Sequence, residues 1–217
     1  RVRAVAVDPE DGDLYAVGMT RFFRSTDQGR TWTVRAQGLA LGEPAVEAGG
    51  DLLSIVPGEP DTLFLARNKS LLRSPDGGAT WQSMDFHPRT AIAALLVDPN
   101  NGQSLFVGTV EEETNVVDEP VPGGLFHSAD GGQTWSEIIK PEEAPYPGSR
   151  PPFSYGVVGL AATPGSPATF FATAGFLLFR STDNGVTWQS VAPAPPPGVG
   201  YILSVAVVPG SPDTVFS

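Results

Sequence analysis

Two opposite charges, Arg3 and Asp51, are the side chains best placed for chemistry, because they occupy one position of a repeated apolar segment. Each of the five copies of this segment runs into a proline, and the position lies six residues before that proline. The other copies carry apolar residues there: Ala93, Val158 and Leu203. Charges in such strands either form a structural ion pair or act on a ligand. The sequence therefore leaves two interpretations open, an Arg3–Asp51 pair or Asp51 as a catalytic or ligand-binding carboxylate.

A second group of candidates is an acidic insertion after the third proline. The proline-to-tryptophan distance is 36 residues from Pro99 to Trp135, against 23, 24 and 24 in the other copies. The insertion forms either a cation site, an acidic contact surface or a solvated hairpin extension, and its spacing does not match a calcium loop. Its carboxylates are those of Glu111, Glu112, Glu113, Asp118 and Glu119.

Two proline-rich segments carry the remaining candidates. Residues 141–156 contain three aromatic rings and one guanidinium, which either stack on a sugar or grip a peptide, or pack onto the strands beneath. Residues 192–201 are typical of a rigid spacer and lead to a further tyrosine. The candidate ligand-binding residues are thus Tyr146, Arg150, Phe153, Tyr155 and Tyr201.

The strands that must position these side chains are marked by a sequence motif that occurs four times, S-x-D-x-G-x-T-W. We call this motif the box. Successive aspartates of this box are 49, 54 and 53 residues apart, which suits a four-stranded propeller blade. Its Ser and Asp can accept hydrogen bonds from turn amides, its Gly permits positive φ, and its Trp can pack back on the blade. We therefore interpret the box as structural. The four copies are Ser25, Asp27, Gly29 and Trp32; Ser74, Asp76, Gly78 and Trp81; Ser128, Asp130, Gly132 and Trp135; and Ser181, Asp183, Gly185 and Trp188.

The apolar runs between the boxes predict an all-β propeller domain of four-stranded antiparallel blades. Each proline-centred segment is typical of two short strands, A and B, joined by a tight turn, and each box joins strands C and D. We expect blades at about residues 1–35, 50–85, 91–140 and 156–192, with half of a fifth at 200–217. This arrangement predicts a larger propeller, or a fifth blade that another chain completes. The irregular segments then share one face with the B–C and D–A loops, away from the boxes.

The boxes resemble the Asp-box, or BNR, repeat of sialidases, xyloglucan-degrading glycoside hydrolases, sortilin-type receptors and the photosystem II assembly propeller. The resemblance covers almost the whole chain. It implies a β-propeller with its boxes on the face opposite the ligand site, and an exported or cell-surface protein. It does not choose between enzyme, receptor and assembly factor.

The composition of the chain argues against several classes of binding partner. The formal net charge of −11 argues against nucleic acid, no apolar run reaches the length of a membrane span, and two isolated histidines give no metal-ligand spacing. We expect no cofactor and no metal. Our main hypothesis is a non-catalytic binding or assembly scaffold with a protein or carbohydrate ligand.

The alternative hypothesis is a glycoside hydrolase of sialidase or xyloglucanase type. Such an enzyme needs two carboxylates facing the scissile bond. Asp51 has no evident second carboxylate, although loops that could approach it carry Glu43, Glu47, Glu142 and Glu143. The arginine clamp of sialidases is poorly matched, because Arg24, Arg73 and Arg180 occupy a repeat position rather than a unique one.

Overall fold

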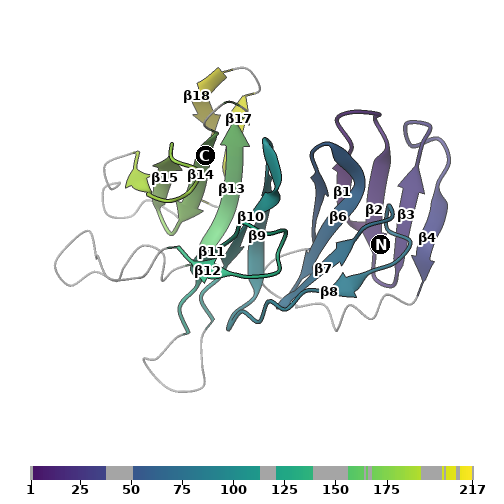
Figure 1. The fold of residues 1–217 in the computed structure, drawn as a ribbon, viewed down its shortest axis with the longest axis horizontal. Coiled ribbons are helices and arrows are strands. Elements are labelled where there is room, and N and C mark those ends of the chain that lie inside the picture. The colour runs from purple at the N-terminus through teal and green to yellow at the C-terminus, as the bar shows by residue number, and fades with distance from the viewer. Residues whose placement is uncertain are drawn as a thin grey trace.

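All regular structure in the described part of the chain is β-strand (Figure 1). The computed structural model describes residues 2–37, 51–112, 121–138, 156–163, 165, 168–191, 202, 204–208 and 211–216. These residues form four four-stranded antiparallel sheets and one two-stranded sheet. None of them forms a helix that could cross a membrane. The predicted all-β fold with four-stranded blades is confirmed.

The strands follow one another in chain order within each sheet. Blade 1 contains β1 (Val2–Val7), β2 (Leu14–Gly18), β3 (Arg21–Ser25) and β4 (Thr33–Gln37). Blade 2 contains β5 (Leu52–Val56), β6 (Glu59–Arg67), β7 (Ser70–Ser74) and β8 (Gln82–Ser83). Blade 3 contains β9 (Ile92–Asp98), β10 (Asn101–Thr109), β11 (Gly124–Ser128) and β12 (Ser136–Glu137). Blade 4 contains β13 (Val157–Thr163), β14 (Thr169–Ala174), β15 (Leu177–Ser181) and β16 (Gln189–Ser190), and the two-stranded sheet contains β17 (Ala206–Val208) and β18 (Ser211–Phe216).

The first strands of the sheets lie next to one another. β1 contacts β5, β5 contacts β9, β9 contacts β13, and β13 contacts β17. Figure 1 shows the sheets fanning outward in chain order, from the purple blade 1 to the green blade 4. Because each sheet is a meander with short turns, the A–B and C–D turns lie at one end of the strands and the B–C turns at the other. The boxes are therefore held at the end opposite the irregular B–C and D–A connections.

The hydrophobic core lies between blades, since both faces of a central blade are covered. Leu53, Ile55 and Leu65 of blade 2 share one buried cluster with Tyr15 and Phe22 of blade 1. Two further clusters join blade 3 to blade 2 and blade 4 to blade 3. Strand alternation directs one set of side chains to each neighbour, so each interface is apolar.

Three of the four box tryptophans belong to these interfaces. We predicted that each Trp packs back on its own blade, but the rings of Trp81, Trp135 and Trp188 pack on the preceding blade. The ring of Trp81 meets that of Phe22 edge-on, with centroids 5.0 Å apart. Trp135 lies 4.5 Å from Phe86, and Trp188 lies 6.4 Å from Phe106. The box thus fixes a blade to its neighbour as well as closing a turn.

Candidate functional site

Each box is a closed set of hydrogen bonds in which the aspartate is the main acceptor. In blade 1, Asp27 Oδ1 accepts from Ser25 Oγ and from the Thr31 backbone N–H, both at 2.8 Å. Asp27 Oδ2 accepts from Thr31 Oγ1 at 2.6 Å, and Gly29 N donates to Ser25 Oγ at 2.9 Å. The indole N–H of Trp32 donates to Gly29 O at 3.1 Å. The same bonds recur in the other three boxes, which supports a structural role.

These bonds predict a distinct acid titration. Hydrogen bonds from the threonine hydroxyl and backbone lower the pKa of Asp27, Asp130 and Asp183 to about 2. An unfolded aspartate titrates near 3.9, so the ionised box stabilises the fold fully above pH ~4, and this contribution is lost as pH falls through about 2. Carboxyl ¹³C NMR should show midpoints near 2 in the folded chain. Thr31→Val should raise the Asp27 midpoint and leave that of Asp183, the internal control, unchanged. An Asp27 midpoint near ~4 in the folded wild-type chain would contradict the box geometry.

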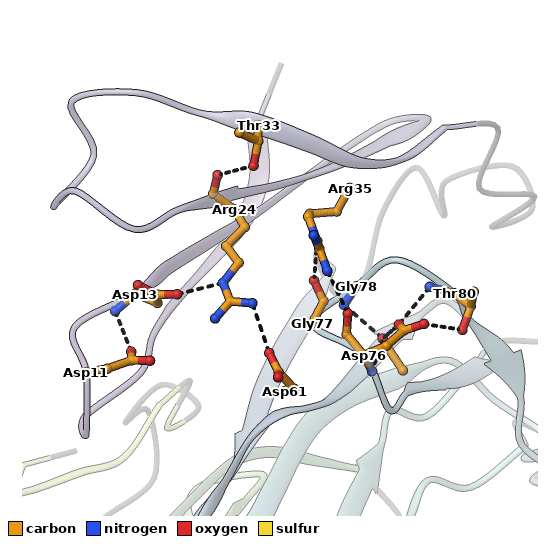
Figure 2. Close-up of polar contacts among 11 residues, drawn as sticks. Asp11, Asp13, Arg24, Thr33, Arg35, Asp61, Asp76, Gly77, Gly78 and Thr80 are labelled. Carbon is orange, nitrogen blue, oxygen red and sulfur yellow. Dashed lines mark hydrogen bonds and ion pairs between the residues drawn. The ribbon is translucent and has the colours of Figure 1, made fainter.

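At the box end, arginines join blade 1 to blade 2 (Figure 2). Arg24 Nε donates to Asp13 Oδ2 of its own blade at 2.6 Å, and its Nη1 donates to Asp61 Oδ1 of blade 2 at 2.9 Å. Arg35 donates to the backbone oxygens of Asp76 and Gly77, at 3.0 and 3.4 Å. These guanidiniums are occupied by neighbouring strands and turns. Arg24 is therefore a connector between blades rather than part of a substrate clamp.

The same repeat position differs in blade 3. His127 replaces the arginine there, and its Nε2 lies 3.0 Å from Ser104 Oγ. The imidazole stacks on Phe106 with ring centroids 4.6 Å apart. Burial lowers the pKa of His127, which favours the neutral ring. This pair occupies the place of Arg24 and Asp13 in blade 1, so it is a variant of the same structural contact.

At the opposite end of the strands, Asp51 is bound by Arg67. Arg67 Nε donates to Asp51 Oδ1 at 2.7 Å, and Nη2 bonds Oδ2. The remaining guanidinium donors reach the backbone oxygens of Gly18 and Met19 in blade 1, each at 3.0 Å. Both charged side chains are only 2% exposed. This Asp51–Arg67 clamp closes the loop-end contact between blades 1 and 2.

The predicted Arg3–Asp51 ion pair is therefore wrong, because the residue that binds Asp51 is Arg67. Arg3 Nε is buried and has no hydrogen-bond partner among the described residues. Comparing only the first strands of the blades could not reveal Arg67, which ends β6. The sequence did contain a signal for the role of Arg67, because it is the one charged residue at a position that holds Gly18, Thr109 and Ala174 in the other blades. Since Arg67 holds both oxygens of Asp51, we propose that Asp51 is structural.

The base of the acidic insertion is closed by an isolated antiparallel β-bridge between Glu112 and Val121. Glu112 and Val121 exchange two backbone hydrogen bonds, of 3.0 and 2.9 Å. Glu112 Oε1 accepts from the Ala91 N–H at 2.8 Å, and Oε2 accepts from Lys69 Nζ at 2.7 Å. The Glu112 carboxylate thus ties the insertion to the connection between blades 2 and 3. Glu113, Asp118 and Glu119 lie outside the described residues.

The other loop-face candidates also lie outside the described residues and remain predictions. They are Tyr146, Arg150, Phe153, Tyr155 and Tyr201, together with the loop carboxylates Glu43, Glu47, Glu142 and Glu143.

The box geometry agrees with a family model. Residues 23–34, 126–137 and 179–190 match the BNR/Asp-box repeat. The chain is an Asp-box β-propeller. The second box lies outside the matched ranges, yet its Asp76 makes the same bonds to Ser74 and Thr80.

Curated relatives of this propeller have xyloglucanase names. It is 28% identical over 193 residues to the probable oligoxyloglucan-reducing end-specific xyloglucanase of Neosartorya fischeri, covering 78% of this chain and 22% of that protein. It is 32% identical over 170 residues to the xyloglucanase Xgh74A of Acetivibrio thermocellus, covering 67% of this chain and 18% of that enzyme. The propeller thus spans about a fifth of the length of these relatives.

Solved structures with similar folds include a xyloglucanase and YCF48. The GH74 xyloglucanase from Xanthomonas campestris superposes with a TM-score of 0.67 at 22% identity, covering 99% of this chain and 34% of that one. YCF48 from Cyanidioschyzon merolae superposes with a TM-score of 0.57 at 16% identity, covering 95% and 60%. At these identities the likeness concerns the fold.

The comparisons correct our main functional hypothesis. We predicted a non-catalytic scaffold, with a glycoside hydrolase as the alternative. Five curated relatives are all named as xyloglucanases, which favours the alternative. The scaffold prediction failed because the boxes that dominate the sequence are structural and occur in enzymes and non-enzymes alike.

Proposed function

We propose that this Asp-box propeller is part of a glycoside hydrolase that cleaves xyloglucan. The observation that carries the proposal is the similarity to named xyloglucanases over 62–78% of the chain. Because the chain spans about a fifth of those relatives, the activity concerns the whole protein. A polysaccharide substrate agrees with our expectation that the protein is exported.

In this proposal the described blades form the framework and the loop face carries the chemistry. Hydrolysis of a glycosidic bond needs two carboxylates, roughly 5–10 Å apart. Asp51 is held by Arg67, and Glu112 is held by Lys69 and the Ala91 amide. The box aspartates are held within their own turns, at the far end of the strands. None of these described carboxylates is free to transfer a proton to a sugar.

We propose that the reacting carboxylates that this chain contributes come from its longer connections. We assign the candidate roles to the glutamates of residues 38–50 and 139–150, namely Glu43, Glu47, Glu142 and Glu143. Tyr146, Phe153 and Tyr155 would supply flat apolar faces for sugar rings, with Arg150 as a hydrogen-bond donor.

The test is hydrolysis by the protein expressed from its full reading frame. We expect release of reducing ends from xyloglucan, with much slower release from unsubstituted cellulose oligomers. Changing each of the four loop glutamates to glutamine should lower kcat by ~10²–10⁴-fold at a position that acts as acid or base. Glu10→Gln is a matched control, since Glu10 accepts from the Gly58 amide at the box end. Absence of release from xyloglucan would overturn the proposal, and full activity in all four variants would remove these four glutamates from the mechanism.

A further inference from the structure

The chain contains two Asn-Gly pairs, Asn101-Gly102 and Asn184-Gly185, and the structure describes both. An asparagine loses its side-chain amide when the backbone nitrogen of the next residue attacks the side-chain carbonyl carbon and closes a succinimide ring. A following glycine has no Cβ to obstruct this attack, so Asn-Gly is the most labile sequence for it. Both asparagines are exposed. The contacts of the two glycines therefore decide which pair reacts.

The fourth box holds the Asn184-Gly185 pair in an unreactive form. Gly185 is buried with φ +81, and its backbone nitrogen donates to Ser181 Oγ at 3.0 Å. A Cβ on Gly185 would overlap the ring of Phe106 in blade 3, so the turn is packed closely against its neighbour. Ring closure would have to break the bond to Ser181 and disturb that contact. The nitrogen that must attack is thus fixed within the box.

The Asn101-Gly102 pair lies in the A–B turn of blade 3, where the hydrogen bonds favour ring closure. Asn101 Oδ1 accepts from the Gln103 backbone N–H at 3.1 Å. This Asx turn keeps the side-chain carbonyl group next to the peptide of the following residue, and the bonded N–H makes the carbonyl carbon more electrophilic. Among the described side chains, none accepts a hydrogen bond from Gly102 N, in contrast to Gly185 N.

Packing explains why this reactive pair has a glycine. A Cβ on Gly102 would overlap Cγ1 of Val56, which ends β5 of blade 2 and is 2% exposed. No side chain can be accommodated at this point without moving a buried valine. The contact between blades 2 and 3 therefore requires the same residue that leaves Asn101 open to attack.

We propose that Asn101 is a site of spontaneous deamidation in the folded protein and that the fourth box protects Asn184. Gly102 N forms a bond to Cγ of Asn101, and the side-chain nitrogen leaves as ammonia with the proton from Gly102 N. Water then opens the succinimide at either carbonyl group, which gives aspartate or isoaspartate. The inference is independent of the proposed hydrolysis.

The isoaspartate product would alter a turn that contacts the blades on both sides. Gly102 packs on Val56 of blade 2, and the side-chain amide of Asn100 donates to Gly165 O of blade 4. Isoaspartate adds one methylene group to the main chain between these two contacts, so both cannot keep their geometry. We therefore expect the modified chain to unfold at a lower temperature than the unmodified chain.

Peptide mass spectrometry of the 217-residue chain, incubated in mildly alkaline buffer, measures both sites. Deamidation increases the peptide mass, and electron-transfer fragmentation distinguishes isoaspartate from aspartate. In the folded chain Asn101 should react at least ~10-fold faster than Asn184, because ring closure at Asn184 must first break a buried hydrogen bond. The chain unfolded in guanidinium chloride is the matched control. Its two rates should be similar, since each asparagine then precedes an unhindered glycine.

Ser181→Ala tests the protection of Asn184, because it removes the acceptor for Gly185 N. It should speed deamidation of Asn184 by ~10-fold, whereas the same change in the second box, Ser74→Ala, should leave that rate unchanged. Thermal unfolding verifies that both variants fold. An unchanged Asn184 rate in folded Ser181→Ala would contradict the assigned protection, and the comparison of folded with unfolded wild type does not depend on either variant.

Asn101→Gln tests the effect on the contacts between blades. The wild-type chain should lose thermal stability as isoaspartate accumulates, and this variant should keep its unfolding midpoint over the same incubation. Equal losses in the two chains would overturn the expected effect on those contacts. The proposal itself is overturned if Asn101 and Asn184 react at equal rates in the folded chain, or if Asn101 stays intact while the unfolded chain is converted.

Discussion

The Asp51→Ala variant is expected to lose roughly 3–5 kcal/mol of unfolding free energy, because it leaves the Arg67 guanidinium buried without its counter-ion. The side chains of Asp51 and Arg67 are each 2% exposed, so water cannot replace the lost carboxylate. The damage should extend to blade 1, whose Gly18 and Met19 carbonyls share the same guanidinium. Urea denaturation at neutral pH measures the loss.

Asp61→Ala is the matched control for this experiment. Asp61 also pairs with an arginine of a neighbouring blade, Arg24, but its side chain is 58% exposed. An exposed pair contributes little, so this variant should lose at most ~1 kcal/mol. A double variant, Asp51→Ala with Arg67→Met, should regain part of the loss, because it removes the orphaned charge.

The same experiment separates the two original interpretations of Asp51. A structural ion pair predicts lost stability, and it predicts that any loss of xyloglucan turnover follows the unfolded fraction. A catalytic carboxylate predicts a stable, folded variant with lost turnover. The second outcome would contradict the clamp described above.

The blades could be predicted from the sequence because the information that specifies them is local. Alternating apolar residues, tight turns and the hydrogen-bonding groups of Ser25, Asp27 and Gly29 all act within one hairpin. The packing of Trp81 on Phe22 could not be predicted in this way, because it depends on how neighbouring sheets meet. The partner of Asp51 was missed for a similar reason. Arg67 reaches it from the far end of the next strand, 16 residues along the chain.

The functional prediction failed at a different level. Boxes repeated in every blade cannot mark a unique site, so the most informative motif carries no information about activity. Single side chains of the predicted loop face, such as Tyr146 or Glu142, have no repeat against which to judge them. Similarity to named enzymes supplied what the pattern of residues could not.

The second large effect is expected from Gly78→Ala, in the box of blade 2. Gly78 has φ +83, which an alanine adopts at a cost of ~1–2 kcal/mol. A Cβ at Gly78 would also overlap the Cδ1 and Cε1 atoms of the Phe22 ring. That ring is fully buried among Tyr15, Val17 and Leu63, so it cannot move aside without disturbing the interface. Overpacking of this kind costs a further ~1–3 kcal/mol.

Comparison with Gly58→Ala separates the packing part of that loss from the backbone part. Gly58 has φ +74, nearly the same backbone conformation, but a Cβ there meets nothing within 4 Å. Its substitution should therefore lose only the ~1–2 kcal/mol of the backbone term. Reducing the ring by Phe22→Leu in the Gly78→Ala background should recover stability relative to the sum of the single losses, as a double-mutant cycle would show. Equal losses for the two glycine variants would mean that the box does not hold blade 2 against Phe22. A larger loss at Gly78 would assign this glycine a role between blades, because it lets the box approach the preceding sheet more closely than any other residue could.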